Sequence, residues 1–274
     1  MLLAVIYLNT PVLASKGVSD VSLNRYTDEG ELAQITYAGR FLAKCSPALG
    51  FTAANGNIGL LLRVRPKRNP LLVKPIGAIE RAHGFCMCIV GLESDCSRVR
   101  RDLHELVESD LFTFGEVPSL EKLSGRMSAF FTRGLYQEDE DNIARPLAAS
   151  TIILQSPLRS SANAPVIPAR LHIVHNTGLV CEGVFATSGS IDTDDEAMER
   201  LAAVVEPLTI SEKADLDLVS SVDALCDILL EHMENMGVVE GCDFECTVCR
   251  SGPGGAHPLY AHGSREEILR MLSI

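Results

Sequence analysis

The sequence predicts a mixed α/β fold of the α+β class, in which antiparallel sheets lie between helix layers. Strand-like runs occur in groups joined by hairpin-length turns, and amphipathic helical segments stand in pairs between these groups. In addition, no Pro/Gly/Ser-rich linker and no internal repeat divides the 274 residues. With 46% hydrophobic residues, the chain can bury the core of one large domain.

The individual elements follow from apolar periodicity and from local start and stop signals. Asn55-Gly56 favours a tight hairpin turn, Pro118 suits a helix start, and Ser264 forms a capping box with Glu267. The strand that ends at Gly91 is apolar on both faces, so it should be covered on both sides. The expected order is a helix opening at 28–30, strands at 48–54, 58–64, 71–73 and 85–90, helices at 95–112 and 119–136, strands at 147–154, 170–174 and 179–185, helices at 192–205 and 215–233, strands at 244–249 and 258–261, and a last helix from 264.

Charge and composition exclude several classes of partner. Asp and Glu total 36 against 24 Lys and Arg, and a net charge of −12 would repel nucleic acid and an anionic membrane surface. Residues 1–15 are partly apolar, but they lack a basic start and are too short to span a bilayer, so we expect a tail. The nine cysteines, an odd number, favour buried thiols in a reducing compartment over a disulfide framework.

Cys242, Cys246 and Cys249 form a CxxxCxxC motif, a spacing with which some enzymes hold a 4Fe–4S cluster. On an extended strand the first two thiols would point to one face and Cys249 to the other, which disfavours a shared cluster. Cys246 and Cys249, followed by His257 and His262, could alternatively bind zinc. A metal- or Fe–S-binding enzyme is therefore the alternative function.

Other candidate motifs point to structural roles. His172 and His175 lie three residues apart on an expected strand, hence on opposite faces, which is poor geometry for chelation. The sequence contains neither a phosphate-binding GxxxxGK motif nor the GxSxG elbow of a serine hydrolase.

The segment from Tyr26 to Ala38 resembles the N-terminal signature of proteasome α-type subunits, in which an aromatic residue precedes Ser-Pro-Glu-Gly-Arg-Leu and a later Gln-Val-Glu-Tyr-Ala. The direct matches are Glu29, Gly30, Leu32, Gln34, Tyr37 and Ala38. The resemblance covers the chain from about Ser19 onward and continues in order through Gly50-Phe-Thr-Ala, Gly91-Leu-Glu-Ser-Asp95, Arg145-Pro146, Asn176-Thr-Gly178 and Ala186-Thr-Ser-Gly189-Ser190.

The resemblance implies a four-layer αββα sandwich of the N-terminal-nucleophile hydrolase type, as a single domain at 28–274 preceded by a pore-gating tail at 1–27. It implies a non-catalytic subunit in the seven-membered α ring of the 20S core particle, in the cytoplasm and nucleus. Its partners would be the other α subunits, the β-ring subunits and regulatory activators, without a cofactor, a metal, nucleic acid or a membrane. Catalytic relatives use an N-terminal threonine with a free amine, whereas Phe51 and Thr52, near that position, follow a whole helix.

Site residues follow from the same resemblance. Asp20 and Tyr37 are the members of the family's gate cluster that this sequence retains. Lys74, with Leu32, would form the pocket for an activator's C-terminal carboxylate, because an ammonium group there pairs with the incoming terminus. The tail is more apolar than is usual in the family, so we expect it to close the pore but to contribute little to the open gate. The acidic insertion before Arg145 is most similar to that of the fifth α-type subunit.

Overall fold

The computed structural model describes residues 26, 30, 32–67, 79–82, 84–136, 145–157, 167–210, 217–238, 241–250 and 257–273. These residues form six α-helices and two five-stranded sheets, and every strand pairing is antiparallel. The α+β class is therefore confirmed. The strand expected at 71–73 and the tail at 1–27, apart from Tyr26, lie outside the described residues.

The first sheet has the strand order β10-β9-β2-β1-β8. Its strands are β1 (Ala48–Ala53), β2 (Ile58–Pro66), β8 (Phe185–Ser188), β9 (Cys242–Arg250) and β10 (His257–Gly263). The predicted hairpin joins β1 to β2: Ala53 pairs with Ile58, and Asn55 and Gly56 between them take positive φ angles.

The second sheet has the strand order β3-β4-β5-β6-β7. Its strands are β3 (Ile79–Ala82), β4 (Phe85–Gly91), β5 (Ala149–Gln155), β6 (Arg170–Val174) and β7 (Val180–Gly183). β4 is buried from Phe85 to Val90, because alternate residues contribute to two different cores. The prediction that this strand is covered on both sides is confirmed.

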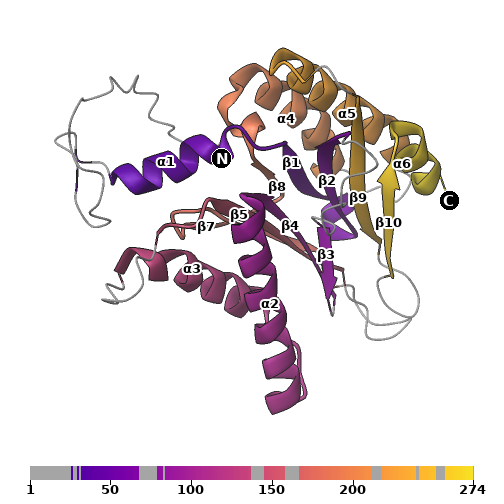
Figure 1. The fold of residues 1–274 in the computed structure, drawn as a ribbon. Helices are drawn as coiled ribbons and strands as arrows, with labels where there is room; N and C mark the ends of the chain where they lie inside the picture. The colour runs from indigo at the N-terminus through magenta and orange to yellow at the C-terminus, as the bar shows by residue number, and fades with distance from the viewer. Residues whose placement is uncertain are drawn as a thin grey trace, which may run out of the picture.

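Helices cover the outer face of each sheet (Figure 1). The second sheet is covered by α2 (Glu93–Phe114) and α3 (Leu120–Tyr136), and the first by α4 (Asp195–Ile210), α5 (Leu218–Asn235) and α6 (Arg265–Leu272). A third cluster of buried apolar side chains, from both sheets, lies between them. The predicted capping box is present at the start of α6, where Ser264 and Glu267 exchange side-chain and backbone hydrogen bonds.

One helix lies outside these layers. α1 (Ala33–Leu42) stands beside the two sheets, and its contacts with them are mainly with β4 and β5 (Figure 1). Its buried residues are Ala38 and Leu42.

The prediction of a single strand at 179–185 is wrong. The chain leaves the second sheet after Gly183 and joins the first sheet at Phe185, so β7 and β8 belong to different sheets. Val184, at the crossing, is exposed, and its carbonyl accepts a hydrogen bond from the Thr52 N–H at 2.8 Å. Strand-forming residues continue through this point, so the sequence pattern did not reveal the change of partner.

Gly91, the last residue of β4, lies against the chain that enters β5. A Cβ at this position would be 2.1 Å from the Ala148 carbonyl oxygen, and the φ angle is +149°. The Leu92 N–H donates to the same carbonyl at 2.8 Å. The close approach of two backbone segments therefore requires glycine here.

We expect Gly91→Ala to lower the free energy of unfolding by about 3 kcal/mol, because the backbone must shift to admit a methyl group. Urea denaturation measures the effect. Gly125→Ala is the matched control: this glycine lies exposed in α3 with nothing within 4 Å of the added carbon, so the variant should gain about 0.5–1 kcal/mol. Equal stability changes in the two variants would contradict the close contact at Gly91.

Candidate functional site

The exposed side of α1 is aromatic. Tyr37 and Phe41 are 44% and 41% exposed and lie four residues apart, so their rings share one side of the helix. The guanidinium of Arg40 lies 5.8 Å from the centre of the Tyr37 ring, within the range of a cation–π contact. Since Ala38 and Leu42 form the buried side, α1 is an amphipathic helix with an apolar surface that faces solvent.

The chain folds back on itself immediately before α1. Tyr26 pairs with Leu32 in an isolated antiparallel bridge, and Gly30 between them has a φ angle of +81°. Tyr26 is 66% exposed, so it adds a third exposed aromatic ring near the start of the helix. The described residues of the segment that carries the family resemblance therefore form this bridge and the helix that follows it.

Two of the four predicted gate and pocket residues lie in the described part of the chain. Leu32 is partly buried at the N-cap of α1, and Tyr37 lies on the exposed side of the same helix. Asp20 and Lys74 lie outside the described residues, so the gate pair and the activator pocket stay predictions.

An ion pair between a buried carboxylate and an exposed arginine joins two segments of the resemblance that are far apart in the sequence. The carboxylate of Asp95, at the start of α2, accepts hydrogen bonds from Arg145 at 2.6 and 2.7 Å and from the Ala148 N–H at 2.9 Å. Burial opposes ionisation of Asp95, but these hydrogen bonds outweigh it and hold its pKa below the usual value. The pair therefore connects the start of α2 to the segment that precedes β5.

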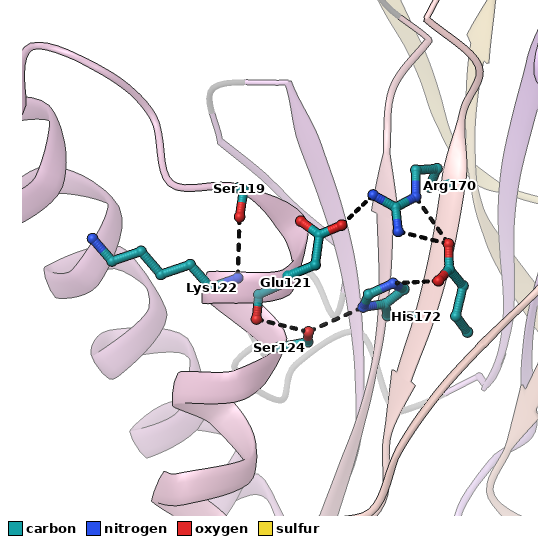
Figure 2. Close-up of polar contacts among 7 residues, drawn as sticks. Ser119, Glu121, Lys122, Ser124, Arg170 and His172 are labelled. Atoms are coloured by element: carbon teal, nitrogen blue, oxygen red, sulfur yellow. Dashed lines mark hydrogen bonds and ion pairs between the residues drawn. The ribbon is translucent and has the colours of Figure 1, made fainter.

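Figure 2 shows a polar cluster where α3 meets the outer strands of the second sheet. Arg170 on β6 donates hydrogen bonds to Glu121 on α3 and to Glu182 on β7, the latter at 2.7 and 2.9 Å. The hydrogen bond from Arg170 lowers the pKa of Glu121 to about 2. Since these carboxylates are exposed, water screens the ion pairs and they contribute little stability.

His172 lies buried beneath this network (Figure 2). Ser124 donates its hydroxyl to the Glu121 carbonyl at 3.3 Å, so its oxygen accepts a hydrogen bond from Nδ1–H of His172 at 3.0 Å. Nε2 of the ring lies 3.6 Å from a carboxylate oxygen of Glu182 and makes no hydrogen bond. Burial lowers the pKa of His172, so the ring is neutral at pH 7 and serves to join α3 to β6.

Ser190, His232 and Asp194 form an arrangement that no sequence motif indicated. Nε2 of His232 lies 2.9 Å from the Ser190 hydroxyl, and Nδ1 lies 2.7 Å from a carboxylate oxygen of Asp194. This is the order of groups in the catalytic triad of serine hydrolases. The only local signal is Asp194, whose other carboxylate oxygen accepts a hydrogen bond from the Ala197 N–H and so caps α4.

The surroundings of this arrangement favour a structural role. Ser190 is 1% exposed and His232 is 5% exposed, so a substrate has no route to the hydroxyl. The Ser190 N–H donates to the Cys45 carbonyl at 2.9 Å and is not available to stabilise an oxyanion. His232 on α5 therefore connects that helix to the segment that starts α4.

The geometry of β9 separates the three cysteines of the CxxxCxxC motif. Cys242 and Cys246 pack in the core between the first sheet and its helices, whereas Cys249 belongs to the core between the sheets. His257 and His262 lie on the neighbouring strand β10. Within the described ranges, no group of three or more His, Cys, Asp or Glu side chains is placed to hold a metal ion.

No family model matches the chain, and a search of the curated proteins finds no relative. Every helix in the part of the chain that the structure describes is too short or too polar to cross a membrane.

The Asp95 pair predicts a specific loss of stability in acid. Because its pKa is lower in the folded chain than in the unfolded chain, the ionised carboxylate stabilises the fold above the unfolded pKa of about 3.9. This stabilisation is lost as the pH falls through the folded pKa. Asp95→Asn should lower the free energy of unfolding at pH 7 by about 2 kcal/mol and flatten its dependence on pH below about 5.

Urea denaturation between pH 3 and pH 7 tests this expectation. Asp195→Asn is the control, because Asp195 is an exposed residue in the first turn of α4, so the change removes a carboxylate from the surface. An unchanged pH profile in Asp95→Asn would contradict the role of the buried carboxylate.

We expect His232→Ala to lower the free energy of unfolding by about 2 kcal/mol, since buried Ser190 loses its partner and Asp194 loses one of its own. A double-mutant cycle of His232→Ala with Asp194→Asn should show a coupling of about 1 kcal/mol. Strictly additive effects in thermal or urea denaturation would mean that the two side chains do not interact.

Proposed function

We propose that the chain is a non-catalytic α-ring subunit of a 20S proteasome core particle, and that its fold is an αββα sandwich of the N-terminal-nucleophile hydrolase type. The observed element order supports this proposal: two antiparallel sheets pack between helix layers, and an additional helix precedes the first strand. The motifs that resemble proteasome α-type subunits supply the family, and the structure supplies the geometry with which that family is compatible.

The observation that carries the proposal is the exposed aromatic side of α1. A ten-residue helix with Tyr37 and Phe41 on its exposed side is unusual on a protein that acts alone, because exposed aromatic patches mark interaction sites. In a ring, this side of α1 would be covered by a neighbouring α subunit. Leu32 at the helix N-cap, with Lys74, would then lie at the docking pocket for an activator's C-terminus, and Asp20 with Tyr37 at the gate.

The position of α1 also supports a non-catalytic role. Catalytic relatives begin at the first strand, where a threonine offers both a hydroxyl and a free amine. Here Phe51 and Thr52 are buried in the middle of β1, and α1 precedes that strand. The Thr52 nitrogen is a peptide N–H that donates to the Val184 carbonyl at 2.8 Å. The chain would therefore serve ring assembly, gating and activator docking in the cytoplasm and nucleus.

The test is the size and composition of the particle that contains the full chain. Affinity purification from the native cell under mild conditions should give an assembly of several hundred kilodaltons, with other α subunits, β subunits and peptidase activity that a threonine-directed inhibitor removes. A small species without such partners would overturn the proposal.

We expect the double variant Tyr37→Ser/Phe41→Ser to enter this assembly at least about tenfold less efficiently, because a ring neighbour would bury both side chains. Ile210→Ser is the control, since Ile210 is 68% exposed at the end of α4, far along the chain from α1. Incorporation is measured by the fraction of tagged chain in the large particle. Equal incorporation of both variants would show that α1 is not the ring contact.

A further inference from the structure

Two buried cysteines face each other across the two sheets. Cys86 on β4 and Cys249 on β9 are 163 residues apart, yet their Sγ atoms lie 3.6 Å from one another. Both side chains belong to the core between the sheets and are at most 1% exposed. Cys249 of the CxxxCxxC motif thus contacts a thiol of the other sheet.

The sheets approach each other closely at this point. Gly59, which pairs with Cys249, has no side chain, and a Cβ there would lie 2.7 Å from Leu154 in the opposite sheet. Leu154 in turn pairs with Cys86. Nearby, residues of β3 and β9 have Cα atoms within 8 Å of each other. A disulfide bond requires the two sulfur atoms to move about 1.6 Å closer, to the usual S–S length of about 2.0 Å.

The surroundings also distinguish the two thiols chemically. The hydroxyl of Ser156 donates a hydrogen bond to Sγ of Cys249 at 3.2 Å. A hydrogen bond donated to sulfur stabilises the thiolate, and the thiolate is the form that attacks a peroxide. Cys249 lies next to the end of β9, and Cys86 is the second residue of β4, so fraying of these strand ends would admit a small oxidant.

We propose that Cys86 and Cys249 are a redox-sensitive pair, which a peroxide converts into a disulfide bond that links the two sheets. In the first step, the Cys249 thiolate attacks hydrogen peroxide, and a sulfenic acid forms with release of hydroxide. In the second step, the Cys86 sulfur attacks that of Cys249, the S–S bond forms and hydroxide leaves. In sum, two thiols lose two electrons and two protons, and one peroxide is reduced to two molecules of water.

The neighbouring cysteines are not expected to react in the same way. Cys246 packs in the core between the first sheet and its helices, on the other side of that sheet from Cys86, and the hydroxyl of Ser156 donates its hydrogen bond to Cys249 rather than to Cys88. Cys181 is exposed and would form bonds between molecules, so we place the test on a Cys181→Ser background. The disulfide would stabilise the fold because it closes a long loop in the unfolded chain.

The experiment treats the full-length Cys181→Ser chain with hydrogen peroxide, blocks the remaining thiols and maps the digested peptides without reduction. We expect a linked peptide pair that has lost two hydrogens and whose fragmentation places the bond between Cys86 and Cys249. Tm should rise by about 5–10 °C on oxidation, and a reductant should reverse the change. Cys86→Ala and Cys249→Ala should each abolish the link, whereas Cys88→Ala, a change in the same strand and the same core, should retain it.

Three outcomes would overturn the proposal. The first is the absence of a linked peptide in the folded Cys181→Ser chain. The second is a link that persists in Cys86→Ala, which would assign the bond to another cysteine. The third is an unchanged or lower Tm after oxidation, a measurement that stays decisive if an alanine variant fails to fold.

Discussion

The face-to-face packing of the two sheets is the constraint on which the rest of the structure depends. Glycines permit it: a Cβ on Gly59 would be 2.7 Å from Leu154, and one on Gly50 would be 3.1 Å from both Ile152 and Leu171 of the opposite sheet. Once the inner faces are in contact, the apolar outer faces need helices, because a sheet with two apolar faces cannot leave either one in water. The close contact between the sheets also brings together cysteines that are distant in the sequence.

Polar side chains inside such a structure must find partners within the protein, because water is excluded. They do so where elements meet. Asp95 binds Arg145 and the Ala148 N–H between α2 and β5, and His232 joins α5 to Ser190 and to Asp194 at the start of α4. Ser190, His232 and Asp194 have the geometry of a catalytic triad, yet their burial makes the arrangement a structural connection. The order of hydrogen-bonded groups is therefore insufficient to identify an active site when the nucleophile has no access to substrate.

α1 precedes the first strand and carries the exposed aromatic side chains Tyr37 and Phe41. Under the proposed function, its position before β1 places an intact peptide bond where a catalytic proteasome subunit would have a free amine, and its aromatic side faces outward. Both features are the basis of the proposed role in assembly. This interpretation draws on residues from one contiguous segment, which is why the sequence motif at Tyr26–Ala38 could suggest it.

The sequence by itself determined the class of fold, most helices and strands, the Asn55-Gly56 hairpin and the Ser264 capping box, since these depend on residues close together in the chain. It did not reveal β3 or the crossing between β7 and β8, because a strand's pattern does not identify the sheet that it joins. Only the tertiary structure decided that Cys249 faces Cys86 and that His232 lies between Ser190 and Asp194. These contacts join residues 38 to 163 positions apart, and packing brings them together without any local pattern.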